Sequence, residues 1–387
     1  MKLLVPCSSI DLKYKLGCTP SWWQLLKALH ESGNEVILTP YLGDPVESLW
    51  WRTYPNPCSL ESKIFNYYLD RKKKNGRLAG RKESSPSLIT KAVDRFVNGK
   101  WEAHILNIME IEKNVDAILF MNVPLNHISG IAEKVRSEYG IPVAYFDGDM
   151  PTILPKYAVK RGFKLNYYCG ADLSEFDLFF TNSKGVTSDL VEMGAREVIP
   201  LYYAVDPAFF RPIDIEKTID ISFFGYGSEF REEWMRKMIT APSVKCPKYN
   251  FCVGGKGFSI DLGCAKAVGD MSYSSFRNFC SKSTICLNIT RWSHTNVFAS
   301  STARPFELAG FGACIVSQPY SGIEEWFDIG KEIIVVNDEE EAMSAYCNLI
   351  ERPDDALAMG ELARTRVLRD HTYTNRAELI CERLGSC

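Results

Sequence analysis

Short runs of apolar and β-branched residues alternate with stretches of helical spacing along both halves of the chain. Strand-like runs at residues 3–7, 35–41 and 116–121 are separated by segments whose apolar residues recur every three or four positions. A second series of the same kind begins near residue 220 and continues to the C-terminal region. Because strands that alternate with helices build βαβ units, we expect an α/β fold with a parallel sheet in each half.

The two series are separated by residues 206–218, a stretch with two prolines and charges of both signs that is typical of a linker. A chain of 387 residues also fits two domains of ordinary size. We therefore predict two Rossmann-like, doubly wound domains, residues 1–210 and 211–370, with residues 371–387 forming a helix that packs back toward the first domain. Ligands of open parallel sheets bind at the carboxyl ends of the strands, so the domains should face each other across a cleft.

Residues 55–100 interrupt the alternation and are interpreted as an insertion or loop. Within them, the segment from Arg71 to Lys82 carries seven basic residues. A solvated loop explains this charge; capture of an anionic acceptor or peripheral contact with a membrane surface is the alternative.

Composition excludes several other classes of protein. The net charge is −3 and the pI is about 6.1, which gives no global attraction to nucleic acid. The sequence has no apolar run long enough for a spanning helix, and its N-terminal apolar run is better explained as a first strand than as a signal peptide. Its thirteen cysteines include no CxxC pair, so we expect reduced thiols in a cytoplasmic protein.

Two glycine-rich segments follow strands of the second half. Gly225 and Gly227 end one predicted strand and precede Arg231, in the first turn of a predicted helix. Gly255 and Lys256 end the next. Glycines let backbone amides approach a phosphate closely, and the two cations suit its charge, although ordinary strand-to-helix turns would show the same pattern.

A third segment, residues 301–327, places Thr302 and Arg304 at the start of a predicted helix and Glu307 in its first turn. A carboxylate can accept hydrogen bonds from both hydroxyls of a ribose, and Arg304 can reach a phosphate or pair with Glu307. A surface ion pair is the alternative.

The run RPFELAGFGACIV, followed by GIEEWF and later by HTYTNR, resembles the nucleotide-binding half of GT-B glycosyltransferases of the glycosyl transferase group 1 kind. The resemblance is greatest to the group named for the spore maturation protein CgeB, and it covers about residues 175–380. It implies that Glu307 holds the donor ribose, that Arg231 and Lys256 neutralise the diphosphate, and that Arg304 and the backbone near Thr302 line the pocket.

The same resemblance implies a nucleoside-diphosphate sugar, UDP-sugar above all, as co-substrate, with no metal and no other cofactor. The second domain would bind this donor and the first domain the acceptor. Retaining members often carry a second glutamate eight residues before the ribose glutamate. Ala299 stands at that position here, which departs from the pattern.

Candidate catalytic groups follow strands at the expected cleft. Asp147 and Asp149, in FDGDM, are interpreted as an acceptor-binding group or base, with helix capping as the alternative. An Asp-x-Asp pair also suits a metal in the other glycosyltransferase fold, but the α/β pattern of both halves argues against that. His127 could line the first domain's side of the cleft and His294 could reach the donor sugar; core or solvated imidazoles are the alternative.

These observations predict a metal-independent, retaining hexosyltransferase-type enzyme that moves a sugar to a hydroxyl acceptor. The acceptor is open among a glycan, a lipid, a protein and a modified nucleic acid. The alternatives are a sugar-nucleotide epimerase or hydrolase on the same fold, and a non-catalytic nucleotide-sugar-binding module.

Overall fold

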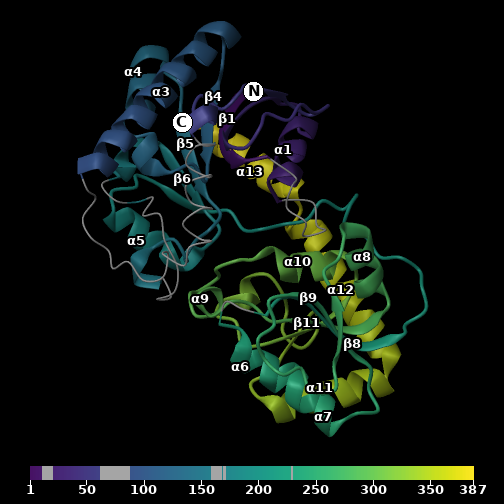
Figure 1. Ribbon diagram of the computed structural model, residues 1–387. Helices are drawn as coiled ribbons and strands as arrows, with labels where there is room; N and C mark the ends of the chain where they lie inside the picture. Colours follow the sequence, from purple (N-terminus) through teal and green to yellow (C-terminus); the bar gives the residue numbers. More distant parts are fainter. Residues whose placement is uncertain (11–20, 62–87, 158–167, 169–170, 228–229) are drawn as a thin grey trace.

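The computed structural model describes residues 1–387 except 11–20, 62–87, 158–167, 169–170 and 228–229, and it shows two lobes with a parallel sheet in each (Figure 1). The first sheet has the order β3-β2-β1-β4-β5-β6-β7. Its strands are β1 Lys2–Ser9, β2 Glu35–Leu42, β3 Arg52–Thr53, β4 Ala117–Met121, β5 Val143–Asp147, β6 Leu178–Thr181 and β7 Val198–Pro200. The order reverses between β1 and β4, which is where Rossmann-like sheets open a ligand crevice.

The second sheet repeats this plan with the order β10-β9-β8-β11-β12-β13. Its strands are β8 Ile219–Tyr226, β9 Phe251–Lys256, β10 Lys266–Gly269, β11 Ser283–Asn288, β12 Cys314–Ser317 and β13 Ile334–Val335. All described pairings in both sheets are parallel. The reversal here lies between β8 and β11, so the ends of these two strands mark the second expected crevice.

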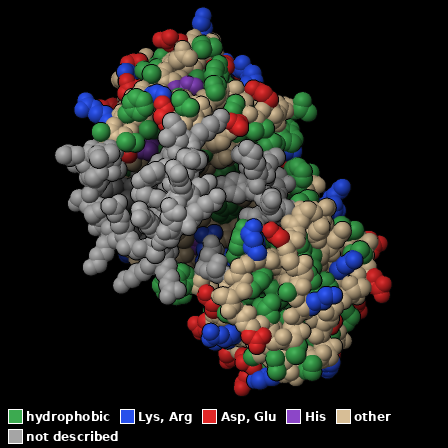
Figure 2. Space-filling model, viewed as in Figure 1, with side chains coloured by type: hydrophobic (Ala, Val, Ile, Leu, Met, Phe, Trp, Pro, Cys, Tyr) green, Lys and Arg blue, Asp and Glu red, His purple; other side chains and the backbone are tan. Residues whose placement is uncertain are grey.

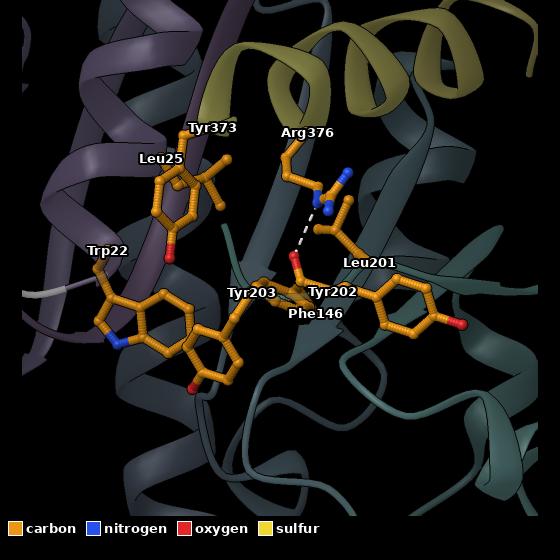
Figure 3. Close-up of a pocket in the computed structure, with 8 residues that line it drawn as sticks. All are labelled: Trp22, Leu25, Phe146, Leu201, Tyr202, Tyr203, Tyr373 and Arg376. Atoms are coloured by element: carbon orange, nitrogen blue, oxygen red, sulfur yellow. Dashed lines mark hydrogen bonds between the residues drawn. The ribbon is translucent and has the colours of Figure 1, made fainter. Parts of the chain in front are cut away.

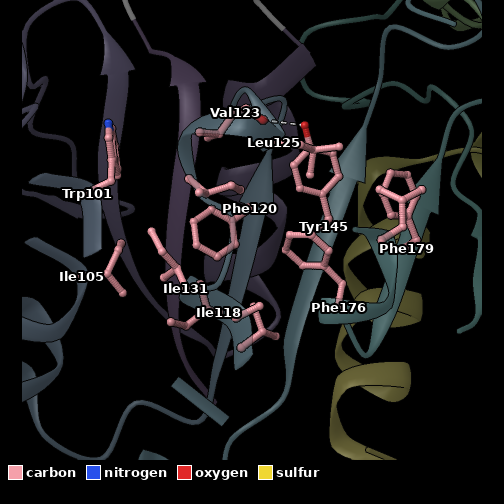
Figure 4. Close-up of a cluster of buried hydrophobic side chains, with 14 of the residues drawn as sticks. Trp101, Ile105, Ile118, Phe120, Val123, Leu125, Ile131, Tyr145, Phe176 and Phe179 are labelled. Atoms are coloured by element: carbon pink, nitrogen blue, oxygen red, sulfur yellow. Dashed lines mark hydrogen bonds between the residues drawn. The ribbon is translucent and has the colours of Figure 1, made fainter. Parts of the chain in front are cut away.

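Helices cover both faces of the first sheet because its strands are apolar on both sides. Leu3 and Val5 of β1 face a cluster with α1 (Ser21–Glu31), whereas Leu4 faces the opposite cluster with α3 (Leu88–Glu112) and α4 (Ile131–Tyr139). Figure 4 shows part of the second cluster, where Trp101 and Ile105 of α3 lie beside the sheet. This alternation is the two-residue period of a strand buried on both faces.

Helix α3 corrects the interpretation of residues 55–100 as an insertion. The helix starts at Leu88, inside that segment, and its buried side chains follow helical spacing, with Trp101, Ile105, Ile108 and Met109 on one face. The helical spacing of these four residues is present in the sequence and could have predicted the helix. The basic residues from Arg71 to Lys82 lie outside the described residues.

The second sheet is covered on one face by α8 (Tyr273–Ser281), α10 (Ala303–Gly310) and α12 (Pro353–Asp370), and on the other by α6 (Glu232–Met235) and α11 (Glu339–Glu351). The sequence predicted a helix with Arg231 in its first turn. In the structure, α6 runs into a π-helical turn at Arg236–Thr240 and then into α7 at Ala241–Lys245. Pro242 has no N–H to donate to the carbonyl oxygen of Met238, which instead accepts a hydrogen bond from the hydroxyl of Tyr346 at 2.9 Å.

The chain passes between the two domains at two places, and these two segments lie side by side. The linker after β7 contains Val205, and the junction between α12 and α13 (Tyr373–Gly385) contains Thr372. These two residues form a parallel bridge, with Tyr373 N donating to Val205 O at 3.0 Å. Beyond it, α13 packs against α1 in the first domain, as Figure 1 shows in yellow. The C-terminal helix therefore ties the second domain to the first.

None of the helices in the described ranges is long and apolar enough to cross a membrane. The cysteines that the structure describes are all free. On the face shown in Figure 2, acidic and basic side chains are interspersed rather than gathered by sign.

Candidate active site

The two glycine-rich segments lie side by side at the carboxyl edge of the second sheet. Strands β8 and β9 pair in a register that sets Gly225 opposite Gly255. Gly255 has a φ of +117°, and a Cβ atom there would overlap the carbonyl oxygen of Gly225. Position 255 therefore requires glycine, and neither glycine covers the backbone at the sheet edge with a side chain. Gly227 is required for a different reason: a Cβ atom there would overlap Phe258.

The two predicted phosphate cations flank the last residue of β8, Tyr226. Arg231 donates from Nη1 to the carbonyl oxygen of Tyr226 at 3.1 Å. The ammonium of Lys256 lies 5.5 Å from the centre of the Tyr226 ring and 3.3 Å from a carboxylate oxygen of Asp270. The Lys256 side chain is half exposed, so it can turn from Asp270 toward an anionic ligand.

Arg304 and Glu307 form an ion pair near the start of α10, although Glu307 lies beyond the first turn of the helix, where the sequence placed it. Their closest atoms, Nη1 and Oε2, are 2.9 Å apart, and the Glu307 side chain is only 8% exposed. The guanidinium of Arg304 lies over the rings of Phe224 and Phe276, at 5.1 and 4.4 Å. Burial raises the pKa of Glu307, and the charge of Arg304 offsets part of that rise. Phe224 lies two residues before Tyr226 in β8. Arg304 therefore lies near the same strand end as Arg231 and Lys256. Thr302, in an extended conformation, is the residue that precedes the helix.

His294 lies on the short helix α9 (Trp292–Thr295) and is buried. Burial first, and then the charges of Arg291 and Arg231, lower its pKa to about 3. The imidazole is therefore neutral at physiological pH and sits in a positive field at the end of β11. Sequence reasoning missed Arg291, although its place just after a strand at the reversal point of the sheet was a usable signal.

Across from these groups, Asp147 ends β5 in the first domain and is completely buried. Its carboxylate accepts a hydrogen bond from the hydroxyl of Tyr168 at 2.6 Å and another from the backbone N–H of Asp149 at 2.8 Å. Burial, followed by the charge of Asp149, raises the pKa of Asp147 to about 7. These contacts favour a supporting role for Asp147 rather than contact with a substrate.

Asp149 is the member of the pair that reaches solvent. Asn122, directly after β4, donates to its carboxylate at 3.0 Å and accepts from Gly148 N at 2.9 Å. Loss of hydration raises the pKa of Asp149, and the charge of Arg291 and the bond from Asn122 offset part of the rise. Arg291 belongs to the second domain, so the two sides of the site are close enough to interact electrostatically. Asn122, at the reversal point of the first sheet, was also missed by sequence reasoning.

Aromatic side chains enclose the loop that carries Asp149. The hydroxyl of Tyr203 donates to the carbonyl oxygen of Gly148 at 3.0 Å, and Trp22 packs edge-on against Phe146 at 5.5 Å. Figure 3 shows Trp22 and Tyr203 together at a small cavity, where Arg376 of α13 donates to the carbonyl oxygen of Tyr202. The cavity has a volume of about 10 Å³, which is room for one water molecule rather than a sugar.

His127 does not join this group. Its ring nitrogens contact the hydroxyl of Tyr41 at 2.6 Å and a carboxylate oxygen of Asp94 at 2.9 Å, and its ring stacks on Tyr41. Both nitrogens are thus engaged between β2 and α3, which supports a packing role.

No cluster of three or more His, Cys, Asp or Glu side chains suited to a metal ion occurs within the part of the chain that the structure describes. The groups at the site are instead cations, carboxylates and glycine backbone, which suit an anionic, hydroxyl-rich ligand.

Comparison with known proteins gives a partial match to one family model and fold-level matches to solved structures. A family model described as glycosyl transferase-like matches residues 231–382, the part that carries Arg231, Lys256 and Glu307. A comparison with curated protein sequences gave no significant match.

Solved structures match over the whole chain. Sucrose-phosphate synthase from Thermosynechococcus elongatus is 11% identical with a TM-score of 0.67, covering 100% of this chain and 98% of that one. HepE from Anabaena, solved with UDP and glucose, is 11% identical with a TM-score of 0.62 and full coverage of both chains. The trehalose-6-phosphate synthase OtsA is 10% identical with a TM-score of 0.64, covering 100% and 99%. The predicted architecture is thereby confirmed: the chain has the GT-B glycosyltransferase fold of two Rossmann-like domains.

Proposed function

We propose that the protein is a glycosyltransferase that moves a sugar from a nucleoside-diphosphate sugar to a hydroxyl group of an acceptor. One observation carries this proposal. The Arg304–Glu307 pair, the two cations and the glycine backbone all lie around the end of β8, and Arg231, Lys256, Arg304 and Glu307 fall within residues 231–382, which the glycosyl transferase-like model matches. Such a set combines acceptors for a ribose with donors for a diphosphate.

In the proposed complex, Glu307 accepts hydrogen bonds from the ribose hydroxyls. Arg231 and Lys256 neutralise the diphosphate, which approaches the backbone at Gly225 and Gly255 and the N-terminus of α10 near Thr302. The fixed positive charges of Arg231 and Arg291 stabilise the negative charge that develops on the departing diphosphate. Because these charges are supplied by the chain itself, we propose that the reaction needs no metal ion.

We propose that Asp149, rather than the buried Asp147, orients the acceptor hydroxyl. Its exposure and its position opposite Arg291 support this role. In the transfer, the bond between the anomeric carbon and the diphosphate oxygen breaks and a bond to the acceptor oxygen forms. The departing diphosphate takes the acceptor proton, which permits retention of the anomeric configuration. We propose that neutral His294 donates a hydrogen bond to the donor sugar.

The finer assignments are also proposals. UDP-sugar is the proposed donor, supported by the UDP-bound HepE structures. We assign the donor to residues 211–370 and the acceptor to residues 1–210, place the chain in the CgeB-like group on the motifs of its second half, and propose a cytoplasmic location.

Isothermal titration calorimetry with UDP-, GDP- and ADP-sugars tests the donor. We expect UDP-sugar to bind, and Glu307→Gln to weaken binding about 10- to 100-fold, the loss of one charge-assisted hydrogen-bonded contact. Glu340→Gln is the matched control, because Glu340 is an exposed glutamate on the first turn of another helix, α11. Absence of binding by all three donors, or equal affinity of the Glu307→Gln variant and wild type, would refute the assignment.

Product analysis then separates the reaction types. We expect transfer to members of an acceptor library, with the anomeric configuration of the donor retained by proton NMR. An inverted product would contradict the retaining mechanism and make Asp149 the general base. Free sugar or an epimerised nucleotide sugar as the sole product would instead show a hydrolase or an epimerase.

A further inference from the structure

The two domains are joined near the site by a short antiparallel backbone contact, here called the interdomain strap, made of residues 182–185 after β6 and residues 298–301 before α10. Ser183 and Ser300 form its bridge. Three backbone hydrogen bonds flank the bridge: Lys184 N to Ala299 O at 3.1 Å, Gly185 N to Phe298 O at 2.8 Å, and Ser301 N to Asn182 O at 2.8 Å. The segment that leads into α10, the helix that carries Glu307, is therefore held by the first domain.

One side chain in the strap reaches both halves of the site. Asn182 is completely buried, and its Nδ2 donates to the carbonyl oxygen of Met150 at 3.0 Å and to that of Ser301 at 2.9 Å. Met150 directly follows Asp149. Ser301 directly precedes Thr302 and the helix that carries Glu307. The amide group of Asn182 thus connects residues 147–150 of the first domain, here called the carboxylate loop, to residues 300–303 of the second domain, here called the donor loop.

The neighbours of Asn182 reinforce this connection. The hydroxyl of Ser301 donates to Asn182 O at 3.0 Å and accepts from Tyr203 N at 3.0 Å, while the hydroxyl of Tyr203 donates to Gly148 O in the carboxylate loop. Ala299, in the strap, has a φ of +43°, a left-handed conformation that a residue with a side chain rarely adopts without constraint. The donor loop is thus held in one defined conformation.

The chemistry of Asn182 argues for a specific role. Its Oδ1 is buried and has no hydrogen-bond partner among the described residues. Burying an amide with half of its hydrogen-bonding capacity unmet is unfavourable, and an apolar side chain of similar size would avoid that cost. The two bonds that Nδ2 donates are what an apolar side chain could not replace.

We propose that Asn182 is a positioning residue for the proposed transfer, which fixes the carboxylate loop, and with it Asp149, at a set distance from the donor loop. This inference rests on the proposed function. Asn182 itself contacts neither substrate; it acts through the two loops. Removing it should therefore impair transfer more than donor binding, because the donor contacts at the end of β8 lie outside the two loops that Asn182 connects.

Transfer kinetics and UDP calorimetry with Asn182→Ala test this. We expect kcat to fall about 10- to 100-fold, as a small misplacement of reacting groups would cause, with the affinity for UDP within threefold of wild type. In the background of Asp149→Asn, which has already lost the acceptor contact, the same change should cost less than threefold. Lys184→Ala is the matched control: it keeps the strap's backbone bonds and removes a side chain that pairs with Glu325 and lies over the Phe298 ring, and it should change kcat less than twofold.

Equal losses of kcat and UDP affinity, or fully additive losses in the double variant, would overturn the positioning role. Hydrogen exchange of the ligand-free protein supplies a readout that needs no turnover. Asn182→Ala should speed amide exchange in both residues 147–150 and residues 300–303, and unchanged exchange in either loop would overturn the proposal. Failure of the proposed function has a different signature, in which wild-type protein neither binds UDP-sugar nor transfers sugar.

Discussion

Removal of Arg304 should destabilise the fold in a way that depends on pH. Arg304→Ala takes away the cation that compensates the carboxylate of Glu307, which is only 8% exposed. Burial already raises the pKa of Glu307, and the variant should raise it further. The folded state then favours protonated Glu307, whereas the unfolded chain ionises it at an ordinary pKa. Stability is therefore lost progressively as the pH rises above about 4.5, and the loss is complete above the raised folded-state pKa.

The size of the effect follows from the geometry. Removing one partner of a buried ion pair costs about 3–5 kcal/mol, and the lower end applies here because the Arg304 side chain is 22% exposed. Part of the loss, about 1 kcal/mol, comes from the contacts of the guanidinium with the Phe224 and Phe276 rings and does not depend on pH. We expect a total loss of about 3 kcal/mol at pH 8 and about 1 kcal/mol at pH 5.

Urea unfolding at both pH values, followed by circular dichroism, measures these differences. Arg304→Ala/Glu307→Gln should recover about 2 kcal/mol at pH 8, because no buried charge remains. Arg352→Ala is the matched control, since Arg352 and Asp355 form a pair of the same spacing with side chains 65% and 58% exposed, and it should cost less than about 0.5 kcal/mol. An equal loss at pH 5 and pH 8, with no recovery in the double variant, would refute the reasoning.

Three further outcomes are expected. Gly255→Ala should destabilise the protein by at least about 3 kcal/mol in urea unfolding, because its Cβ atom would overlap Gly225 O at a positive φ; a loss below 1 kcal/mol would contradict the close approach of β8 and β9. Because the pKa of Asp147 is raised to about 7, wild-type stability should fall as the pH rises from about 4 to 7, by at most about 4 kcal/mol, and Asp147→Asn should remove this decline; an unchanged pH profile in the variant would count against it. His294, with a pKa of about 3, should show no titration between pH 5 and pH 8 by nitrogen NMR of its ring, and a midpoint in that range would contradict its burial beside Arg291.

The sequence predicted the two parallel sheets well because the alternation of apolar runs with helical spacing is a local signal. It failed at the π-helical turn of Arg236–Thr240, near which Pro242 offers no N–H to the carbonyl oxygen of Met238. The partner that this oxygen takes instead, the hydroxyl of Tyr346, lies far along the chain. The missed start of α3 is a different error, since the spacing of Trp101, Ile105 and Ile108 was present but was overlooked beside a strongly basic segment.

The candidate site was predictable only in part, for a related reason. Glycines and charged residues that follow strands stand out in a sequence, and the register of β8 and β9 brings Gly225 and Gly255 together. Asn182 looks like any polar residue after a strand, and its two bonds to Met150 and Ser301 require the folded arrangement of both domains. Asp147 is buried and Asp149 is exposed, and their positions two residues apart in the sequence do not predict this difference.

A crystal structure of the protein with bound UDP tests the central claim most directly. The account predicts the diphosphate between Arg231 and Lys256, beside the paired glycines of β8 and β9, with both ribose hydroxyls within hydrogen-bond distance of Glu307. UDP bound elsewhere on the molecule, or in this place with its ribose turned away from Glu307, would contradict the account.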